Sequence, residues 1–422
     1  MNTIEFVKDL NNRFFNGEMS PQFQDKLQQL PIDRPDVFSF VERIFSLMSS
    51  NGMPAKDLSL QQADVLGTLL ARILPGAWEG RVPPITVKGR HAVIDQYIKK
   101  NHWLNSGGKT MLDIGCGFPP FTTIEAADYL SDWNITGADP SMPDYLIYDV
   151  EGNYATLDEN KSTVYFQPAM PSIENWNKLL TDSAATKKRF ENLLDELLDQ
   201  PAYEGFPRME LNPVKNYETE RLTFIKGGIG QINITPKDVI RCFNVLYYFD
   251  DQFLENALKW FAENTKERGI VLIGGDWAAS TESYYTIYQK NGSQLVKKEF
   301  VFSIDCICPF GIVTWYAMHD DDRQKAELVS YIRILRNDKS FMDAFYTFHD
   351  AQRMNYKACP RDSEGYYGAV DPSIPPQDIW TITSKMLNEL NEAGYNQQAV
   401  EVLIRAGLKA RVNEVGHIAI EP

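Results

Sequence analysis

A short turn rich in glycine is the part of the sequence best suited to chemistry. In TMLDIGCGFPPFTTIEAADYL (110–130), an apolar run ends in Asp113, Gly115 and Gly117 follow, and a helical pattern begins near Phe121. Glycine lets the backbone approach a ligand closely, and the start of a helix presents free amide groups to an anionic group. The segment therefore predicts a ligand-binding turn between a strand and a helix.

Two kinds of ligand use such a turn: the pyrophosphate of a dinucleotide and the methionine end of S-adenosylmethionine. A dinucleotide site follows the pattern G-x-G-x-x-G, whose third glycine packs the helix on the strand. Pro120 stands at that third position here. A carboxylate before the first glycine, as Asp113 stands, instead suits a cationic amino group. The turn therefore favours S-adenosylmethionine.

These residues resemble motif I of the class I S-adenosylmethionine-dependent methyltransferases, written as an acidic residue, x, Gly, x, Gly, x, Gly. Asp113, Gly115 and Gly117 match this motif, Cys116 lies between the two glycines, and Pro119 replaces the last glycine. The resemblance covers about residues 90–318. It implies a Rossmann-like α/β fold that binds S-adenosylmethionine through residues of this turn.

Two further positions fall where this superfamily places cofactor contacts. Asp139 ends the second expected strand, 22 residues past Gly117, and the resemblance implies that it binds the two ribose hydroxyls. The turn after the third strand, in LTFIKGGIGQI, occupies the place of the adenine-contacting turn. It has Gly228 where the family often has Asp, so we expect backbone amides or Ile229 to contact the adenine.

A longer stretch, DVIRCFNVLYYFDDQFLENALKWFAENTKERGIVLIGG (238–275), is similar to chemotaxis receptor methyltransferases and many small-molecule methyltransferases. The resemblance implies that the strand-ending Asn244 lies near the methionine of the cofactor and the reacting methyl group. Its place at the carboxyl end of a strand, where open α/β sheets bind ligands, supports this role. The alternative is that Asn244 caps the helix starting near Asp250.

The elements that must position these residues alternate between short apolar runs and helices, which is typical of a parallel α/β sheet. We expect strands at 110–115, 134–139, 221–225, 238–245 and 269–275. Two later strands, at 294–304 and 311–318, are close enough in sequence to pair antiparallel.

Helical regions flank this predicted methyltransferase domain (89–320) on both sides. Residues 1–88 form an N-terminal helical region that ends in the Pro- and Gly-rich stretch 75–84, and residues 321–422 form a C-terminal helical extension. An insertion at 141–220, longer than the usual connection between strands, contains a strongly helical piece. We expect the N-terminal helices and the insertion to form a lid over the methyl-donor end and to supply much of the acceptor pocket.

Composition narrows the function classes. Lys and Arg total 42 against 57 for Asp and Glu, so the net charge is −15 at pH 7. Such a charge repels a nucleic-acid backbone, and only short basic clusters are present. No window reaches the ~18 apolar residues of a membrane-spanning helix, and no secretory signal is evident. We therefore expect a cytoplasmic protein with no nucleic-acid or membrane partner.

The cysteines and acidic runs do not predict a metal site. The five cysteines are an odd number spread thinly through the chain, which favours reduced thiols (Cys116, Cys242, Cys306, Cys308 and Cys359). Cys306-x-Cys308 would place two thiols on one strand face, but a second ligand pair is missing. The run after His319, Asp320–Asp322, is explained by acids at a helix start. A metal-dependent catechol-type enzyme would also carry Asp in place of Asn244.

The sequence thus predicts an S-adenosylmethionine-dependent, metal-independent methyltransferase, acting on a small molecule by O- or carboxyl-methylation. An alcohol or amine acceptor needs a base, and the candidates are Tyr247, Tyr248, His91 and His319. A carboxylate acceptor needs none. Two alternatives remain: a protein side-chain carboxyl methyltransferase, and a cofactor-binding scaffold without turnover.

Overall fold

The structure is a computed structural model. It describes residues 2–30, 32, 35–50, 52–58, 60, 86, 88–104, 109–170, 173–199, 205–276, 281–308, 323–358, 361–366, 374 and 376–422. Residues 61–74 of the expected N-terminal helical region, the Pro- and Gly-rich stretch 75–84 and the expected strand 311–318 lie outside these residues.

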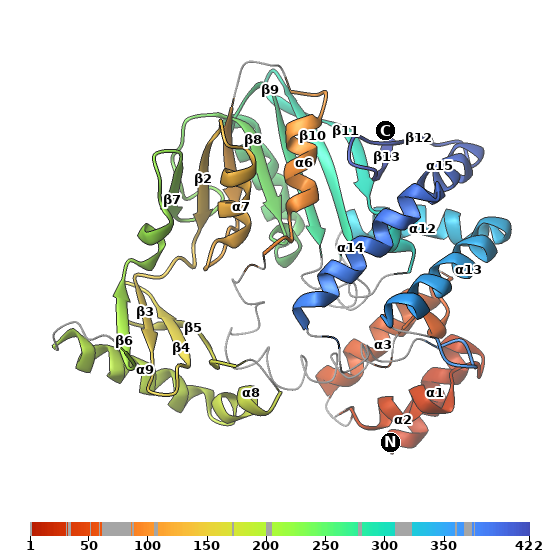
Figure 1. The fold of residues 1–422 in the computed structure, drawn as a ribbon, viewed down its shortest axis with the longest axis horizontal. Coiled ribbons are helices and arrows are strands. Elements are labelled where there is room, and N and C mark those ends of the chain that lie inside the picture. Colours follow the sequence, from red (N-terminus) through yellow and green to blue (C-terminus); the bar gives the residue numbers. More distant parts are fainter. Residues whose placement is uncertain are drawn as a thin grey trace.

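Within the described residues, nine strands form one sheet, in the order β12-β13-β11-β10-β9-β8-β1-β2-β7 (Figure 1). Its parallel part consists of β1 (Thr110–Ile114), β2 (Asn134–Asp139), β7 (Leu222–Lys226), β8 (Lys237–Phe243) and β9 (Thr265–Asp276). The chain builds outward from β1 through β2 to β7 and then returns to the other side of β1 with β8 and β9. The strand order therefore reverses between β1 and β8, which is where doubly wound sheets bind ligands.

The remaining strands extend the sheet antiparallel beyond β9. They are β10 (Ser283–Asn291), β11 (Gln294–Phe302), β12 (Lys409–Val412) and β13 (Ile418–Glu421). The sequence analysis anticipated β11 but not β10, and β11 pairs with β10 and β13. The two C-terminal strands were also missed, because four-residue strands at the end of a helical region carry little pattern of their own.

Helices cover both faces of the parallel strands, as alternate side chains require. Met111 and Val239 face α6 (Ala92–Lys100) and α7 (Phe121–Tyr129), while Leu112 and Ile240 face α10 (Asp251–Asn264). Strands buried on both faces become almost continuously apolar, which is the pattern read from the sequence. The α/β fold class with a Rossmann-like strand order is thus confirmed.

The segment between β2 and β7 contains a second, four-stranded antiparallel sheet. Its order is β5-β4-β3-β6, formed by β3 (Tyr145–Tyr148), β4 (Tyr154–Leu157), β5 (Thr163–Gln167) and β6 (Arg208–Leu211). It packs on α8 (Ile173–Leu180) and α9 (Ser183–Leu198) around buried residues such as Phe166 and Phe190. The helical piece was predicted and the strands were not. The 3-10 helix η3 (Pro213–Tyr217) leads back to β7.

The N- and C-terminal helices lie next to each other. The first group comprises α1 (Thr3–Phe15), α2 (Pro21–Gln28), α3 (Pro35–Ser50) and the 3-10 helix η1 (Ala55–Asp57); the second comprises α12 (Arg323–Asn337), α13 (Lys339–Tyr356), α14 (Pro376–Glu392) and α15 (Tyr395–Arg405). Asp57 forms a buried ion pair with Arg336 at 2.5 Å and accepts a hydrogen bond from Tyr346. The division of the chain into three regions remains a prediction.

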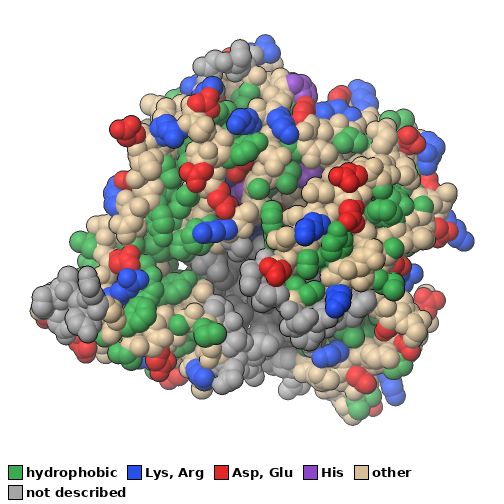
Figure 2. Space-filling model, in the orientation of Figure 1, with side chains coloured by type: hydrophobic (Ala, Val, Ile, Leu, Met, Phe, Trp, Pro, Cys, Tyr) green, Lys and Arg blue, Asp and Glu red, His purple; other side chains and the backbone are tan. Residues whose placement is uncertain are grey.

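The carboxyl ends of the parallel strands face the side of the molecule on which the insertion and the N-terminal helices lie (Figure 1). On the face shown in Figure 2, acidic and basic side chains are interspersed over the described residues, without an extended basic patch. Among the described residues, no helix combines the length and apolar character needed to cross a membrane.

Candidate functional site

The turn after β1 is anchored by Asp139 at the end of β2. The Asp139 carboxylate accepts hydrogen bonds from the backbone N–H of Gly117 at 2.9 Å and of Ser141 at 2.7 Å. Gly115 and Gly117 have φ angles of 77° and 65°, which glycine adopts without strain. A Cβ at position 115 would lie 2.3 Å from Cγ2 of Val245. The turn is therefore shaped by contacts with the ends of both β2 and β8.

The turn after β7 lies against the same place. The Gly227 N–H donates to the carbonyl oxygen of Asp139 at 3.1 Å, and a Cβ at Gly228 would be 3.7 Å from Cδ of Pro140. Ile229 packs, half-buried, beside the core on the α10 face of the sheet. Gly228, Ile229 and Asp139, which the sequence analysis assigned to one ligand, thus come together at one edge.

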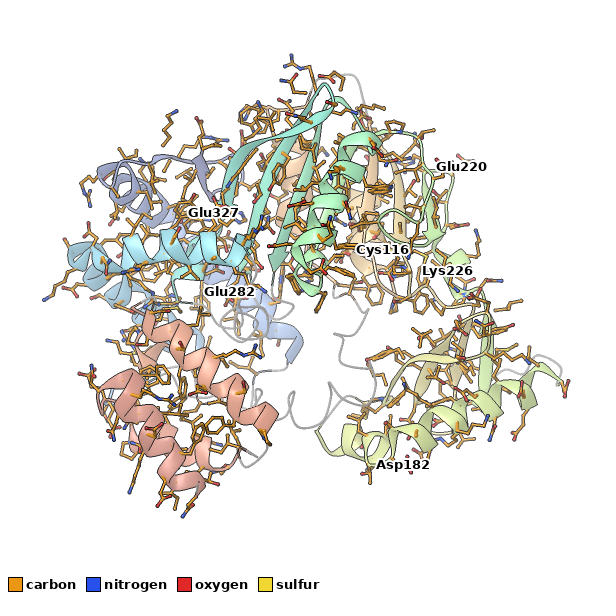
Figure 3. The ribbon with its side chains drawn as sticks, turned by 180° about the vertical axis from the view of Figure 1, so that it is seen from behind. Cys116, Asp182, Glu220, Lys226, Glu282 and Glu327 are labelled. Atoms are coloured by element: carbon orange, nitrogen blue, oxygen red, sulfur yellow. The ribbon has the colours of Figure 1, made fainter. Side chains whose placement is uncertain are left out.

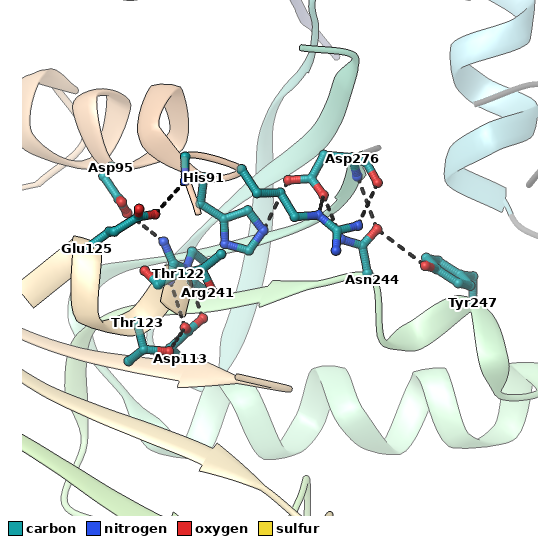
Figure 4. Close-up of polar contacts among 12 residues, drawn as sticks. His91, Asp95, Asp113, Thr122, Thr123, Glu125, Arg241, Asn244, Tyr247 and Asp276 are labelled. Atoms are coloured by element: carbon teal, nitrogen blue, oxygen red, sulfur yellow. Dashed lines mark hydrogen bonds and ion pairs between the residues drawn. The ribbon is translucent and has the colours of Figure 1, made fainter. Parts of the chain in front are cut away.

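Asp113 does not present a free carboxylate. Its two oxygens accept hydrogen bonds from Nε and Nη2 of Arg241, at 2.8 and 2.7 Å, and Oδ2 also accepts one from the Thr123 hydroxyl at 2.6 Å (Figure 4). Burial alone would raise the pKa of Asp113, but the charge and hydrogen bonds of Arg241 outweigh it, so this pKa lies below its ordinary value. Within the protein Asp113 thus already holds a cation, and a contact between Asp113 and the cationic amino group of a ligand stays a prediction.

Arg241 is the principal residue that sequence reasoning missed. It is fully buried on β8, and its Nη1 donates to Oδ1 of Asp95 on α6 at 2.5 Å. Burial raises the pKa of the Asp95 carboxyl to about 7, although Arg241 lowers it. An arginine inside the apolar run DVIRCFNV was a usable signal, because a buried arginine requires an acidic partner.

The start of α7 is less open than the sequence suggested. The backbone N–H of Phe121, the first residue of α7, donates to the Thr86 hydroxyl at 2.9 Å, and that hydroxyl donates to the carbonyl of Pro119 at 2.6 Å. Gly89 donates its N–H to Glu125 on the same helix at 2.7 Å. The segment that precedes α6 therefore runs across the start of α7 and occupies one amide that a ligand was expected to use.

A second polar network joins the ends of β8 and β9. The Asn244 side chain donates to Oδ1 of Asp276 at 2.7 Å and accepts from the Asp276 backbone N–H at 3.1 Å. Asn244 has a φ of 58°, which ends the strand two residues before the predicted limit. The hydroxyl of Tyr247 donates to Asn244 Oδ1 at 3.3 Å. Asp250, and not Asn244, caps α10, through the N–H of Phe253.

Arg90 and His91 complete this network from the segment before α6. Arg90 Nε donates to Oδ1 of Asp276, and His91 Nε2 lies 3.0 Å from Asp276 Oδ2. Figure 4 shows His91 between the Arg241 network and Asp276. Burial would raise the pKa of Asp276, but Arg90 and His91 outweigh it, so this pKa is well below its ordinary value. Burial lowers the pKa of His91 and leaves its imidazole neutral near pH 7.

The structure describes three of the four candidate bases. His91 is buried, and its Nδ1 makes no hydrogen bond with the described residues. Tyr247 and Tyr248 lie in the 3-10 helix η4 (Leu246–Tyr248) with their rings 4.5 Å apart, and burial raises the pKa of Tyr248 well above its ordinary value. His319 lies outside the described residues.

The four cysteines within the described residues are all buried with free thiols. Cys116 is buried, with its sulfur 3.2 Å from where a Cβ on Gly137 would lie, and burial raises its pKa well above the ordinary value. Cys306 and Cys308 do not lie on a strand as expected, because the 3-10 helix η5 (Ile304–Ile307) follows β11. Among the described residues, no group of three or more His, Cys, Asp or Glu side chains is arranged to bind a metal ion.

Comparisons with known proteins give a limited result. No protein-family model matches the sequence, and no curated protein matches it. Among solved structures, TnmH aligns with 43% of this chain and 34% of its own, at 15% identity and a TM-score of 0.21. The match therefore spans about a third of the TnmH chain.

Two other solved structures have a named activity. The N-methyltransferase NodS from Bradyrhizobium japonicum aligns over 43% of this chain and 67% of its own, at 14% identity and a TM-score of 0.20. Coclaurine N-methyltransferase, bound to N-methylheliamine and SAH, aligns over 64% of this chain and 57% of its own, at 11% identity and a TM-score of 0.23. Superpositions of this quality do not assign an activity to the chain.

Proposed function

We propose that the protein binds S-adenosylmethionine at the carboxyl edge of β1, β2, β7 and β8 and is a metal-independent methyltransferase. The observation that carries this proposal is the convergence of the turns after β1, β2 and β7 beside the point, between β1 and β8, where the strand order reverses. The Gly115–Gly117 turn is hydrogen-bonded to Asp139, and the Gly227–Gln231 turn is hydrogen-bonded to the same residue.

The residues at this edge fit the proposed ligand. Each carboxylate oxygen can accept more than one hydrogen bond, so Asp139 has acceptor capacity left for two ribose hydroxyls after binding the amides of Gly117 and Ser141. Gly228 lacks a side chain beside Pro140, and Ile229 supplies an apolar surface for the adenine. Asp113 holds Arg241 beneath the turn, which fixes its carboxylate next to the proposed place of the amino group of the ligand, and Cys116 serves as a small buried residue there.

A dinucleotide fits less well. Its pyrophosphate binds the free amides at a helix start, whereas the Phe121 amide at the start of α7 already donates to Thr86. To bind there, a pyrophosphate would have to displace the Thr86 hydroxyl from the Phe121 amide. The hydroxyl would then also lose its hydrogen bond to the Pro119 carbonyl. This favours S-adenosylmethionine, whose methionine and ribose can be bound without a phosphate at the helix start.

The bound sulfonium would supply the methyl group for an in-line displacement, which requires alignment of the reactants and exclusion of water. Of the candidate bases, we favour His91. Its imidazole is neutral, Asp276 lies 3.0 Å from Nε2 to stabilise an imidazolium, and Nδ1 makes no hydrogen bond with the described residues. Asn244 and Arg90 fix Asp276, so they act as positioning residues.

The proposed acceptor is a small molecule. We favour methylation of a hydroxyl group over methylation of a carboxylate, because His91, oriented by Asp276, could serve as the base that a hydroxyl group requires. A protein side-chain carboxylate and a scaffold without turnover remain the alternatives. Nothing in the interspersed surface charge of Figure 2 favours a nucleic-acid partner. The lid formed by the N-terminal helices and the insertion also remains a proposal.

Isothermal calorimetry tests the cofactor. S-adenosylhomocysteine should bind with a micromolar-scale dissociation constant, and neither NAD nor ATP should compete with it. Heat from NAD but none from either sulfur compound would overturn the proposal. The acceptor class is then tested with S-adenosylmethionine labelled in the methyl group: label in a small-molecule extract supports the proposal, label in a protein band supports the protein methyltransferase, and cofactor binding without any product supports the scaffold.

A further inference from the structure

The short segment that carries His91 has a defined backbone turn. We call residues 88–91 the strap; it directly precedes α6 and contacts both α7 and the end of β9. Gly89 has a φ of 80°, which glycine adopts without strain. Its carbonyl oxygen accepts a hydrogen bond from the Ala92 N–H at 3.1 Å. The strap therefore enters α6 through a tight turn that begins two residues before His91.

The inner side of the strap lies on the sheet. Arg90 donates from Nε to Oδ1 of Asp276, and from Nη2 to the Asp276 carbonyl oxygen at 2.9 Å. His91 lies against Oδ2 of the same residue, and its ring centroid is 5.2 Å from that of Phe243. The side chains of Arg90 and His91 are 15% and 8% exposed. The burial of His91 therefore depends on how closely the strap follows the sheet.

Glu125 of α7 holds the strap by its backbone. The Gly89 N–H donates to Oε2 of Glu125 at 2.7 Å, and the Glu125 side chain is half-buried. A hydrogen bond to an ionised carboxylate is stronger than one between neutral groups. This contact fixes the strap one residue before Arg90.

Trp380 of α14 lies on the strap at the same residue. Its ring atoms Cζ2, Cε2 and Cη2 are 3.4, 3.5 and 3.5 Å from where a Cβ on Gly89 would lie, so the indole packs directly on the glycine backbone. The helix α14 is itself fixed to α13, because Gln352 donates to the Met386 carbonyl oxygen at 2.9 Å and to Glu389 at 2.8 Å. Figure 1 and Figure 3 show, from opposite sides, the start of α14 reaching toward the carboxyl edge of the sheet.

We propose that Trp380 and Glu125 are positioning residues for His91: by holding Gly89, they keep the strap on the sheet and the imidazole against Asp276. The proposal rests on the proposed function, in which His91 is the base. It gives the C-terminal helices a part in the reaction, since α14 supplies the indole that lies on the strap.

The position of His91 is tested through its own titration. NMR follows the protein isotope-labelled in its histidine side chains, and the His91 signal is assigned by its loss in His91→Gln. Burial is the main cause of the lowered His91 pKa. Trp380→Ala should let water reach the imidazole and raise this pKa by about one pH unit, whereas Trp380→Phe keeps a ring on Gly89 and should restore it. An unchanged pKa in Trp380→Ala, with its circular dichroism preserved, would overturn the proposal.

Glu125 provides a second, independent pair of variants. Glu125→Ala removes the acceptor of the Gly89 N–H, whereas Glu125→Gln removes the same charge and keeps an oxygen acceptor. The His91 pKa should therefore be higher in Glu125→Ala than in Glu125→Gln, and equal values would contradict the role of Glu125. Trp260→Ala, at a half-buried position of α10 on the other face of the sheet, is the control for Trp380→Ala. A shift of equal size in this control would show general loosening and overturn the proposal.

Charged groups around the imidazole also influence its pKa. They are Asp276 of β9, Arg241 of β8, Asp113 of β1, Asp95 of α6, which is bonded to Arg241, and Arg90 of the strap. Of these, Asp95 has a pKa of about 7 and titrates within the range of the measurement. The titrations are therefore repeated with Asp95→Asn in every protein. The difference between Trp380→Ala and Trp380→Phe should persist, and its loss would assign the shift to Asp95 and overturn the proposal.

Cofactor binding and methyl transfer are measured in parallel, so that the proposed function and the role of the strap can fail separately. S-adenosylhomocysteine should bind Trp380→Ala as it binds the unaltered protein. With the acceptor found by methyl labelling, the acidic limb of the pH–rate profile should move upward with the His91 pKa in Trp380→Ala and return in Trp380→Phe. A raised His91 pKa with an unmoved limb would contradict His91 as the base, and a lack of S-adenosylhomocysteine binding would contradict the proposed function. Neither result would change what the titrations say about Trp380 and Glu125.

Discussion

The buried Arg241 network makes a prediction that contrasts two similar substitutions. Asp113 accepts two hydrogen bonds from Arg241, and Asp95 accepts one. In Asp113→Asn, an amide N–H₂ would face a guanidinium donor, and the strongest counter-charge would be lost. Removing one partner of a buried ion pair costs about 3–5 kcal/mol. We expect a loss of about 3 kcal/mol in the free energy of unfolding.

Asp95→Asn should behave differently because the Asp95 carboxyl is costly to ionise. An asparagine oxygen can still accept the hydrogen bond from Arg241 Nη1. With a folded pKa of about 7 against an ordinary value of 3.8, the contribution of Asp95 to stability is fully present below pH ~4 and is lost as the pH rises through ~7. The slope is ~1.4 kcal/mol per pH unit within that window.

Comparison of the variants with the unaltered protein isolates this effect from other titrating groups. Asp95→Asn should gain about 3 kcal/mol relative to the unaltered protein between pH 5 and pH 8 and should cost under about 1 kcal/mol at pH 8. In Asp113→Asn, Asp95 can ionise and partly replace the lost charge. The double variant should therefore be less stable than the sum of the two single effects predicts.

The assay is urea unfolding followed by circular dichroism and tryptophan fluorescence at pH 5 and pH 8, with coincidence of the two transitions as the check for two-state behaviour. Asp128→Asn, at an exposed position on α7, removes the same charge as a control. Equal losses in Asp95→Asn and Asp113→Asn, or a difference that does not change with pH, would refute the reasoning.

Three further substitutions test other parts of the site. Gly115→Ala places a Cβ 2.3 Å from Val245 at a φ of 77°; we expect a loss of about 1–3 kcal/mol in thermal unfolding and weaker S-adenosylhomocysteine binding, and an unchanged melting temperature would contradict the geometry. Asp139→Ala should weaken calorimetric binding of S-adenosylhomocysteine by about 1–3 kcal/mol and also lower the melting temperature, because Gly117 and Ser141 lose their acceptor; an unchanged dissociation constant would exclude the ribose role. His91→Gln should lower kcat by ~100-fold or more for an alcohol acceptor and remove the acidic limb of the pH–rate profile, with little effect on cofactor binding; a retained limb would exclude His91 as the base.

Local pattern predicted the parallel half of the fold well. Apolar runs buried on both faces identified β1 and β2, the edge strand β7 was also predicted, and the glycine turn was recognised because its residues are adjacent in sequence. The limit of β8 was misplaced because the left-handed backbone at Asn244, which ends the strand, has no distinct signal in an otherwise apolar run.

Side-chain contacts between residues far apart in the sequence could not be predicted from local pattern. Asp113 and Arg241 are separated by 128 positions, and only the register of β1 against β8 brings them together. The same holds for Asn244 with Asp276, and for Thr86 at the start of α7. The strands of the insertion were missed because they are short and pair antiparallel with one another, without the alternation of strand and helix that identified the parallel sheet.

Hydrogen exchange with and without S-adenosylhomocysteine tests the central claim most directly. The account predicts slower exchange in four segments. Three are the turns after β1, β2 and β7, at 114–121, 139–142 and 226–231, and the fourth is the end of β8 at 243–248. These segments meet only in the folded protein. Additional protection within 1–90 or 141–220 would support the lid. No change in the four segments, or protection confined to other parts of the chain, would contradict the assignment of the site.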